Sequence, residues 1–260
     1  KLETWSGGEN LYRGGKGPLK VNRSKINERF PLFNSLIKAA AEAGYETFED
    51  SNGFKQDGFG TFDVTIDGGK RQSVARAYLE EVKNFKNLII KHKIDVSKII
   101  FKDKKAIGVE VKNNNNTEIY HCNKEIILSA GSINSPKILQ LSGVGDPKLL
   151  MQNNIEVIHE LPGVGQNLQD HLEIYIQHKS KTKDTLYNLS TNYFTQAIEG
   201  MKWFLLKQGM LTYSHLELGG FVKTSDKYKH PNIQLHFFPS LVINHGLTNP
   251  SFDGFQFHAS

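Results

Sequence analysis

Cysteine and arginine are both scarce in this sequence of 260 residues. The one cysteine, Cys122, excludes a disulfide framework within the chain and is typical of a reducing compartment. Only five of the 32 basic residues are arginines, and the lysines are scattered apart from a cluster at Lys179, Lys181 and Lys183. Nucleic-acid surfaces usually gather arginine and aromatic side chains on one face, so the composition argues against a nucleic-acid partner. The net charge of +5 predicts a solvated basic surface, with attraction to an anionic membrane surface as the alternative.

Long apolar runs are missing as well. No segment approaches the roughly 20 apolar residues that a membrane-spanning helix needs. The first ten residues, KLETWSGGEN, contain no apolar core of a signal peptide. Because the chain also lacks an initial methionine, we expect an internal fragment of a longer protein, with any targeting segment upstream.

Several catalytic motifs are absent. There is no Gly-x-Ser-x-Gly elbow, which argues against a serine hydrolase. No set of histidine, cysteine and aspartate has metal-ligand spacing, so we expect no metal. A Gly-x-Gly-x-x-Gly turn is also missing, because Gly143-Val-Gly145 and Gly163-Val-Gly165 both lack the third glycine.

The periodicity of apolar residues predicts helices and strands in separate stretches. Helical spacing is found at residues 31–43, 72–85 and 191–208, and Ser135-Pro136 and Asp146-Pro147 are typical starts of two short helices. Runs rich in β-branched residues predict strands at residues 88–90, 96–101, 107–111, 117–122, 125–129, 215–222, 233–238 and 255–258. Four asparagines at residues 113–116 predict a hairpin turn. The fold class is therefore α/β or α+β.

Residues 125–145 (EIILSAGSINSPKILQLSGVG) carry the sharpest signal. A buried strand would lead to Ala130-Gly131-Ser132, where small side chains let a large group approach the backbone. The helix that follows would point free N–H groups at the same place, which suits the phosphates of a dinucleotide. The alternative is an ordinary strand-turn-helix packing that needs Gly131 only for close contact.

The same segment resembles the second signature of the glucose–methanol–choline (GMC) oxidoreductases. Small residues are followed by Ser135-Pro136, two aliphatic residues and the Ser-Gly-Val-Gly of residues 142–145. The resemblance continues through residues 12–21 (YRGGKGPLKV), 69–79 (GKRQSVARAYL) and 161–171 (LPGVGQNLQDH). It implies an FAD-dependent alcohol oxidoreductase. It also implies part of an FAD-binding, Rossmann-like domain at residues 72–170, with a substrate domain built on an antiparallel sheet at residues 1–71 and 171–260.

For the cofactor, the resemblance implies that the backbone of Val96 contacts the adenine end of FAD. Ala130 and Gly131 would pack near it, with Asn167 and Asp170 holding a neighbouring loop. For Asn167, a simple turn-capping role is the alternative. The family's catalytic histidine and its His/Asn partner would lie downstream of residue 260, so we expect no catalytic residue in this fragment.

Further similarity is found at residues 2–21, 170–177 (DHLEIYIQ), 215–222 (HLELGGFV) and 233–246 (IQLHFFPSLVINHG). On these segments the chain most resembles the choline-oxidising branch of the family, in which choline becomes betaine aldehyde on the route to glycine betaine. That branch implies a glutamate for the trimethylammonium group, and Glu217 is the candidate. Strand alternation places His215 and Glu217 on one face, and His236 and Phe238 on one face of the next strand. Either these faces line a cavity, with Glu217 and His236 binding substrate, or they face solvent.

Other functions stay open. The substrate could be an aromatic or sugar alcohol, and the chain could be a non-catalytic module that keeps the fold without flavin; a nicotinamide dehydrogenase is a third alternative. The electron acceptor and the oligomeric state cannot be read from the sequence. The expected location is mitochondrial, at the inner membrane, for a eukaryotic source, and cytoplasmic or membrane-associated for a bacterial one.

Overall fold

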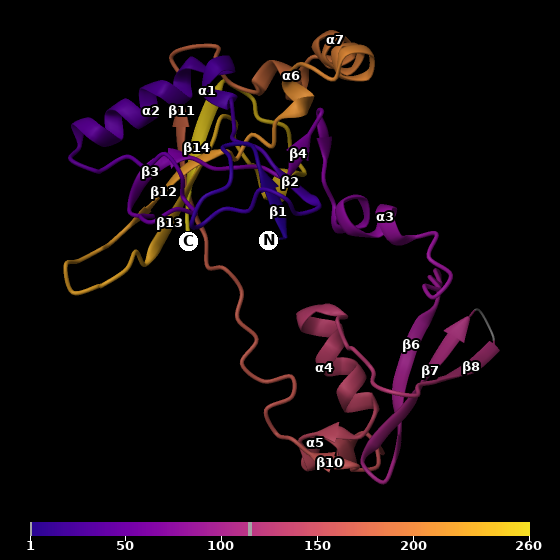
Figure 1. Cartoon of the computed structure of the whole chain (residues 1–260). Coiled ribbons are helices and arrows are strands. Elements are labelled where there is room, and N and C mark those ends of the chain that lie inside the picture. The colour runs from indigo at the N-terminus through magenta and orange to yellow at the C-terminus, as the bar shows by residue number, and fades with distance from the viewer. Residues whose placement is uncertain (1, 114–115) are drawn as a thin grey trace. The chain divides into compact units, whose positions relative to one another are not determined.

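The computed structural model describes residues 2–113 and 116–260, without the side chains of Asn27 and Arg29. The chain divides into two compact units, which we describe separately. Lys1–Phe85 and His171–Ser260 form the sheet unit, and Lys86–Asp170 forms the meander unit. The first boundary between the units lies after Phe85, whereas the sequence placed the domain boundary before residue 72. The helical segment that begins at residue 72 therefore belongs to the sheet unit. The expected mixture of helices and antiparallel sheet is confirmed (Figure 1).

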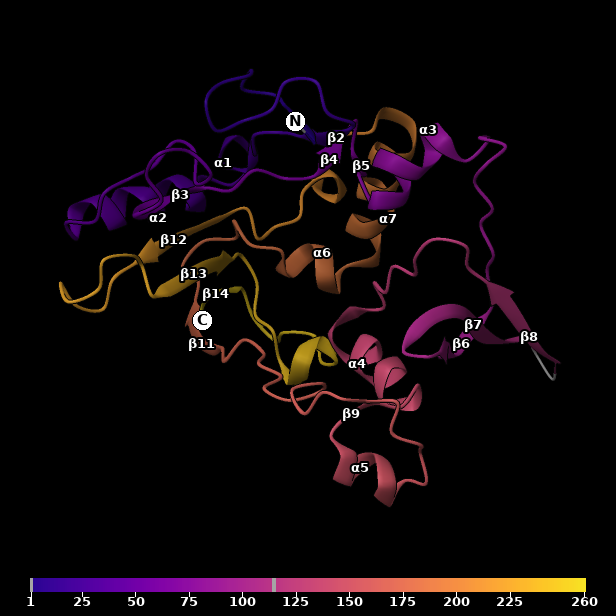
Figure 2. The same ribbon diagram turned by 60° about the horizontal axis from the view of Figure 1, so that its bottom comes forward.

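A five-stranded antiparallel sheet is the centre of the sheet unit, as Figure 2 shows from a second direction. Its strands lie in the order β11 (Ile174–Lys179), β14 (Gly254–Ala259), β13 (Ile233–Phe238), β12 (Leu218–Val222) and β3 (Gly58–Thr61). Every neighbouring pair is antiparallel. The strand expected at residues 233–238 is confirmed with these bounds.

One face of this sheet packs into the hydrophobic core. Leu218, Phe237 and Phe257 are register partners across β12, β13 and β14, so their side chains form a row on one face. Helix α2 (Pro31–Glu42) places Phe33 against this row, with the Phe33 and Phe237 rings nearly perpendicular and their centroids 5.0 Å apart. Proline at the first position of α2 starts the helix as expected, because its missing N–H has no partner to lose there.

The opposite face carries polar and aromatic side chains. Gly219, His236, His258 and Tyr175 form a row of register partners across four strands. A Cβ on Gly219 would lie 1.9 Å from the Leu235 carbonyl oxygen. Glycine is therefore required for the close approach of β12 to β13.

Short elements complete the sheet unit. They are β1 (Glu3–Trp5), β2 (Leu19–Val21), α1 (Ile26–Arg29), β4 (Ile66–Asp67), β5 (Lys70–Arg71), the π-helix η1 (Ala75–Leu79), α3 (Glu80–Val82), α6 (Tyr187–Thr191), α7 (Tyr193–Met201), the π-helix η2 (Lys202–Leu206), and the 3-10 helices η3 (Met210–Thr212) and η4 (Asn244–Gly246). The long helix expected at residues 191–208 is thus formed by α7 and η2 together.

A buried arginine joins the N-terminal loops. The Arg13 guanidinium pairs with Glu3 at 3.0 Å, Asp50 at 2.8 Å and Asp63 at 2.9 Å. Burial raises the pKa of the Asp63 carboxyl, although the Arg13 charge opposes the shift. Because one cation serves three carboxylates, loss of Arg13 would leave buried charges uncompensated.

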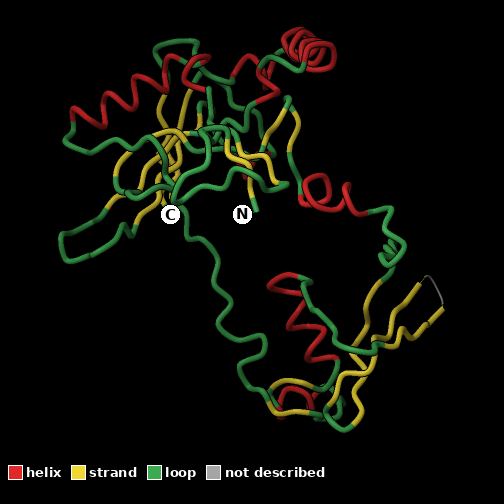
Figure 3. Tube along the Cα trace, in the orientation of Figure 1, coloured by secondary structure: helices red, strands yellow, loops and turns green. Residues whose placement is uncertain are grey.

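The meander unit contains a three-stranded antiparallel sheet of β6 (Asp95–Lys102), β7 (Lys105–Asn113) and β8 (Asn116–His121). These strands confirm three of the expected runs; the turn expected at residues 113–116 falls partly on residues 114–115, outside the described ones. Around this sheet lie α4 (Gly131–Leu141), β9 (Val144–Gly145), α5 (Pro147–Gln152) and β10 (His159–Glu160), followed by the long loop drawn green in Figure 3. Ile99 N donates to Ser142 Oγ at 2.7 Å and ties the end of α4 to β6.

Some expected boundaries were wrong. Residues 88–90 and 125–129 are not strands, because none of the described segments pairs with them. Helix α4 begins at Gly131 rather than at Ser135-Pro136, and the Ser135 hydroxyl instead accepts a hydrogen bond from Ala130 N at 3.0 Å. Strand β12 begins at Leu218 rather than at His215, because His215 has φ +66°, which lies far from the extended backbone of a strand.

Candidate functional site

Glu217 lies directly before β12, and its side chain is buried in the sheet unit, with the residue only 1% exposed. The Ser24 hydroxyl and the Ser214 backbone N–H both donate to its carboxylate. The Ser24 hydroxyl accepts at the same time from Ile26 N at 3.1 Å, which orients its proton toward Glu217. Among the described side chains, no cation forms an ion pair with Glu217. A buried carboxylate that has donors but no counter-charge is an electrostatic cost that a cationic ligand would relieve.

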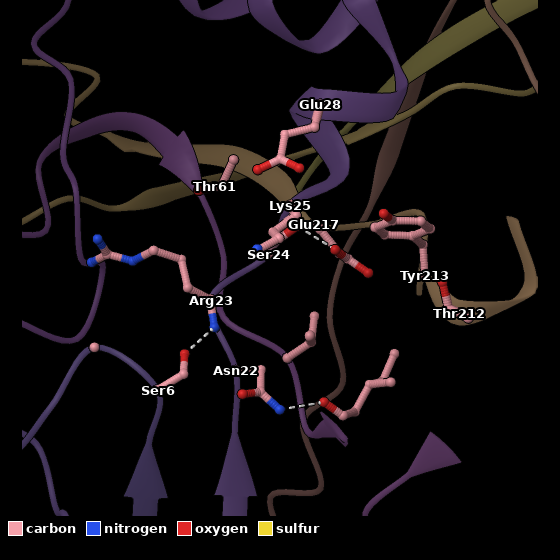
Figure 4. A pocket seen from close by; sticks show the side chains of 13 residues that line it. Ser6, Asn22, Arg23, Ser24, Lys25, Glu28, Thr61, Thr212, Tyr213 and Glu217 are labelled. Atoms are coloured by element: carbon pink, nitrogen blue, oxygen red, sulfur yellow. Dashed lines mark hydrogen bonds between the residues drawn. The ribbon is translucent and has the colours of Figure 1, made fainter. Parts of the chain in front are cut away.

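This carboxylate borders a pocket of about 770 Å³. Figure 4 shows Glu217 between Ser24 and Tyr213, whose ring lies beside the carboxylate. The lining residues are Ser6, Gly7, Asn22, Arg23, Ser24, Lys25, Glu28, Thr61, Val64, Ile66, Thr212, Tyr213 and Glu217. A carboxylate and an aromatic ring on one pocket are the two groups that can hold a quaternary ammonium ion, which has no N–H to donate.

The cations that line the pocket, Arg23 and Lys25, form no ion pair with Glu217 in the described structure. The Arg23 guanidinium stacks on the Trp5 ring at 5.0 Å and donates to the Glu49 carbonyl oxygen at 3.1 Å, and it points away from Glu217 in Figure 4. Glu28, which is exposed, adds a second carboxylate to the lining. The lining therefore holds two carboxylates, Glu217 and Glu28, and two cations, Arg23 and Lys25, of which neither is ion-paired with Glu217 among the described side chains.

His236, the second substrate candidate, lies in different surroundings. It sits on β13 opposite Gly219 and His258, and it does not border the Glu217 pocket. Its ring meets Phe62 edge-on at 5.6 Å, and its buried Nδ1 has no hydrogen-bond partner in the described structure. Burial, followed by the charge of His258, lowers the pKa of His236 and favours the neutral imidazole. The structure thus separates His236 from Glu217.

The polar sheet face also holds a hydrogen-bonded chain that sequence reasoning missed. His258 Nδ1 lies 2.8 Å from a Glu173 oxygen, and its Nε2 contacts the side-chain amide of Gln256. The Gln256 side-chain oxygen accepts from Gln177 Nε2 at 2.9 Å and from Val242 N at 2.7 Å. The Glu173–His258 and Gln177–Gln256 partners are 85 and 79 positions apart, so only strand pairing could reveal them. Ser24 was missed at the Glu217 pocket for the same reason, whereas Tyr213, only four residues from Glu217, could have been found from the sequence.

The cofactor candidates lie in the meander unit. Val96 on β6 and Ala130 before α4 both line a pocket of about 720 Å³, which also contains Lys98, Lys112 and Lys137. Gly131, the first residue of α4, has φ +88°, and a Cβ there would meet no atom within 4 Å. A helix start without a side chain beside an open, basic pocket suits part of a nucleotide.

Asn167 and Asp170 lie apart from that pocket. Asn167 has φ +55° and lines a separate pocket of about 740 Å³ together with Ser132 and Gln140. Asparagine tolerates this left-handed conformation better than most residues, which agrees with a turn-forming role. Asp170 is the last residue of the meander unit. The structure thus brings Val96 and Ala130 together and leaves these two residues outside their pocket.

Comparison with known proteins shows the family to which the chain belongs. The GMC oxidoreductase family model matches residues 2–173, so the chain belongs to the GMC oxidoreductase family. Formate oxidase has the same fold, with a TM-score of 0.86 at 22% identity over all of this chain and 50% of that one. An FAD-dependent oxidoreductase from Chaetomium thermophilum matches with a TM-score of 0.76 at 33% identity, over 85% of this chain and 41% of that one.

Sequence relatives narrow the comparison within the family. The mitochondrial choline dehydrogenase of Mus musculus is 43% identical over 251 residues, which cover 96% of this chain and 42% of that protein. The oxygen-dependent choline dehydrogenase of Escherichia coli (strain K12 / DH10B) is 42% identical over 261 residues, 99% of this chain and 47% of that protein. The chain therefore spans less than half the length of these relatives.

Proposed function

We propose that the whole protein is an FAD-dependent oxidoreductase that converts choline to betaine aldehyde. The observation that carries this proposal is Glu217, a buried carboxylate that borders a pocket beside Tyr213 and has no described counter-charge. At about 5 Å and an effective dielectric near 20, a carboxylate attracts a cation by roughly 3 kcal/mol, or about a hundredfold in Kd. Identity of 42–43% to two proteins named choline dehydrogenases supports the same substrate.

For the cofactor, we assign the pocket of Val96 and Ala130 to the adenine end of FAD. When bound, FAD supplies the hydride acceptor for the alcohol carbon. Gly131 leaves the start of α4 open to it, and Asn167 and Asp170 would hold a neighbouring loop, of which residues 165–169 line a separate pocket. This chain contributes binding; the proton-accepting pair is expected in the downstream part of the protein.

The test compares choline with its uncharged isostere, 3,3-dimethylbutan-1-ol, in the full-length enzyme. Glu217→Gln should weaken choline binding by at least tenfold and barely change the neutral alcohol, because only choline loses a charge interaction. Glu28→Gln is the matched control, since Glu28 lines the same pocket but is exposed. Equal effects of Glu217→Gln on both alcohols would remove Glu217 from the site and weaken the choline assignment.

The location belongs to the same proposal. The mouse relative is named as mitochondrial and the Escherichia coli relative is bacterial, which supports either of the two locations expected from the sequence. In either location, the proposed small-molecule partner is an alcohol.

A further inference from the structure

The two carboxylate oxygens of Glu217 each accept a hydrogen bond from a different segment. Ser24 Oγ donates to Oε2, and the Ser214 backbone N–H donates to Oε1 (Figure 4). Hydrogen bonds to an ionised carboxylate are stronger than those between neutral groups, and a donor on each oxygen also fixes the plane of the carboxylate. The orientation of this charge at the pocket therefore depends on its two donors.

The Ser24 hydroxyl has only one direction in which to donate. Its oxygen accepts from Ile26 N at 3.1 Å, and its single proton is then directed to the Glu217 carboxylate, which can only accept. Ser24 is 7% exposed, so water has little access to compete for that proton. The hydroxyl therefore acts as a dedicated donor to Glu217.

Both ends of this hydrogen bond are attached to the hydrophobic core. Ser24 is followed closely by Ile26, the first residue of α1, and Glu217 is followed directly by Leu218, the first residue of β12. Ile26 and Leu218 are each 0% exposed and belong to one buried cluster. Packed neighbours hold polar groups in place more precisely than a free loop does. The Ser24–Glu217 pair is therefore preorganised before any ligand arrives.

We propose that Ser24 is a positioning residue for the cation site, whose hydroxyl holds the Glu217 carboxylate in the orientation that receives a quaternary ammonium ion. Ser24 acts through Glu217, so its removal affects a charged substrate and leaves an uncharged one of the same shape almost unaffected. Without this donor the carboxylate must be ordered when the cation binds, and that cost lowers affinity. The inference rests on the proposed function, because it takes Glu217 as the group that binds the cation.

The experiment compares kcat/KM for choline with kcat/KM for 3,3-dimethylbutan-1-ol in the full-length enzyme. Ser24→Ala should lower the ratio of the two by about tenfold, the usual effect of losing one hydrogen bond to a charged group. Ser24→Thr keeps the hydroxyl and should restore most of the ratio. Ser51→Ala is the matched control, since Ser51 is also 7% exposed but does not line the pocket, and its ratio should equal that of the wild type.

Both alcohols are measured on one preparation, so a smaller folded fraction cancels from the ratio. If Ser24→Ala yields no folded protein, Ser24→Cys replaces it, because the thiol fills the space but is a weak donor, and it should lower the ratio in the same direction.

The double variant Ser24→Ala/Glu217→Gln separates positioning from a general structural role. Once Glu217 is glutamine, Ser24→Ala should change the ratio by less than about twofold, because the charge through which it acts is gone. An unchanged ratio in Ser24→Ala, or an equal loss with and without Glu217, overturns the inference. In that case a ratio that still falls in Glu217→Gln leaves the proposed function standing. A ratio that Glu217→Gln does not change contradicts the proposed function itself, and the role of Ser24 with it.

Discussion

At the scale of single residues, the chemistry depends on side chains whose partners come from distant parts of the chain. Ser24 and Glu217 are 193 positions apart, and Glu173 and His258 are 85 apart. Both contacts orient a charged or ionisable group in a mostly buried place, where each hydrogen bond counts for more than it would in water. Single substitutions there should therefore have specific effects.

Gly131 gives the first such prediction. Gly131→Val in the full-length enzyme should lower flavin occupancy more than Tm, because the added side chain enters the open space beside the cofactor pocket. Gly246→Val is the matched control: Gly246 has φ +82° and the same empty surroundings, so it bears equal backbone strain away from that pocket. Flavin absorbance per protein and Tm are measured for both. Equal loss of flavin in the two variants would reduce Gly131 to a backbone role.

Acid sensitivity should come from two partly buried histidines. Burial lowers the pKa of His215, although a hydrogen bond to the Met210 backbone opposes the shift, and burial also lowers the pKa of His236. The unfolded chain then binds more protons than the folded one below about pH 6.5, so stability is fully present above that pH and falls as the pH drops. Urea midpoints at pH 7.5 and 5.5 should show this fall, and His236→Gln should reduce it. An unchanged pH dependence in His236→Gln would rule His236 out as a contributor.

At the scale of elements, the two faces of the five-stranded sheet differ in polarity and in what packs against them. The row of Leu218, Phe237 and Phe257 packs under α2, whereas the row of His236, His258 and Tyr175 stays polar. The face under α2 supports stability, and the opposite face holds the hydrogen-bonded chain of Glu173, His258 and Gln256.

Phe33→Ala tests the packing of α2 on the sheet. Phe33 is 0% exposed, and removal of a buried phenylalanine ring leaves a cavity that costs about 3–5 kcal/mol. The control, Phe54→Ala, removes the same ring from a residue that is 88% exposed and should change stability by less than about 0.5 kcal/mol. Chemical denaturation measures both. A loss below about 1 kcal/mol for Phe33→Ala would mean that α2 is not held mainly by this contact.

At the scale of the whole molecule, the chain corresponds to only part of its relatives in the family. It spans less than half the length of its choline dehydrogenase relatives, and its sequence contains no Gly-x-Gly-x-x-Gly turn for a pyrophosphate. The 260-residue chain alone should therefore bind FAD weakly or not at all. Absorbance after gel filtration measures this, with the full-length protein as the positive control. A stoichiometric flavin spectrum on the isolated chain would contradict the expectation.

Local patterns determined much of this protein in advance. The alternation at residues 233–238 and the proline at residue 31 define their strand and helix through nearest neighbours alone, so both were predictable. The glycine-rich signature at residues 131–145 carried the resemblance to the family in the same way, because it is one contiguous run of residues. Each feature depends on contacts within a few residues, which the sequence records directly.

The tertiary structure decided what depends on long-range pairing. Alternation assumed that the strand began at His215 and so grouped Glu217 with His236, whereas the strand begins at Leu218 and only Glu217 of the two lines the pocket. Whether residues 125–129 join a sheet depends on a neighbouring strand, which no local pattern specifies. Tyr213 and Glu217 meet Ser24 because two segments far apart in the sequence converge on one pocket. Core packing brings these segments together, since Ile26 and Leu218, which are close neighbours of Ser24 and Glu217, belong to one buried cluster.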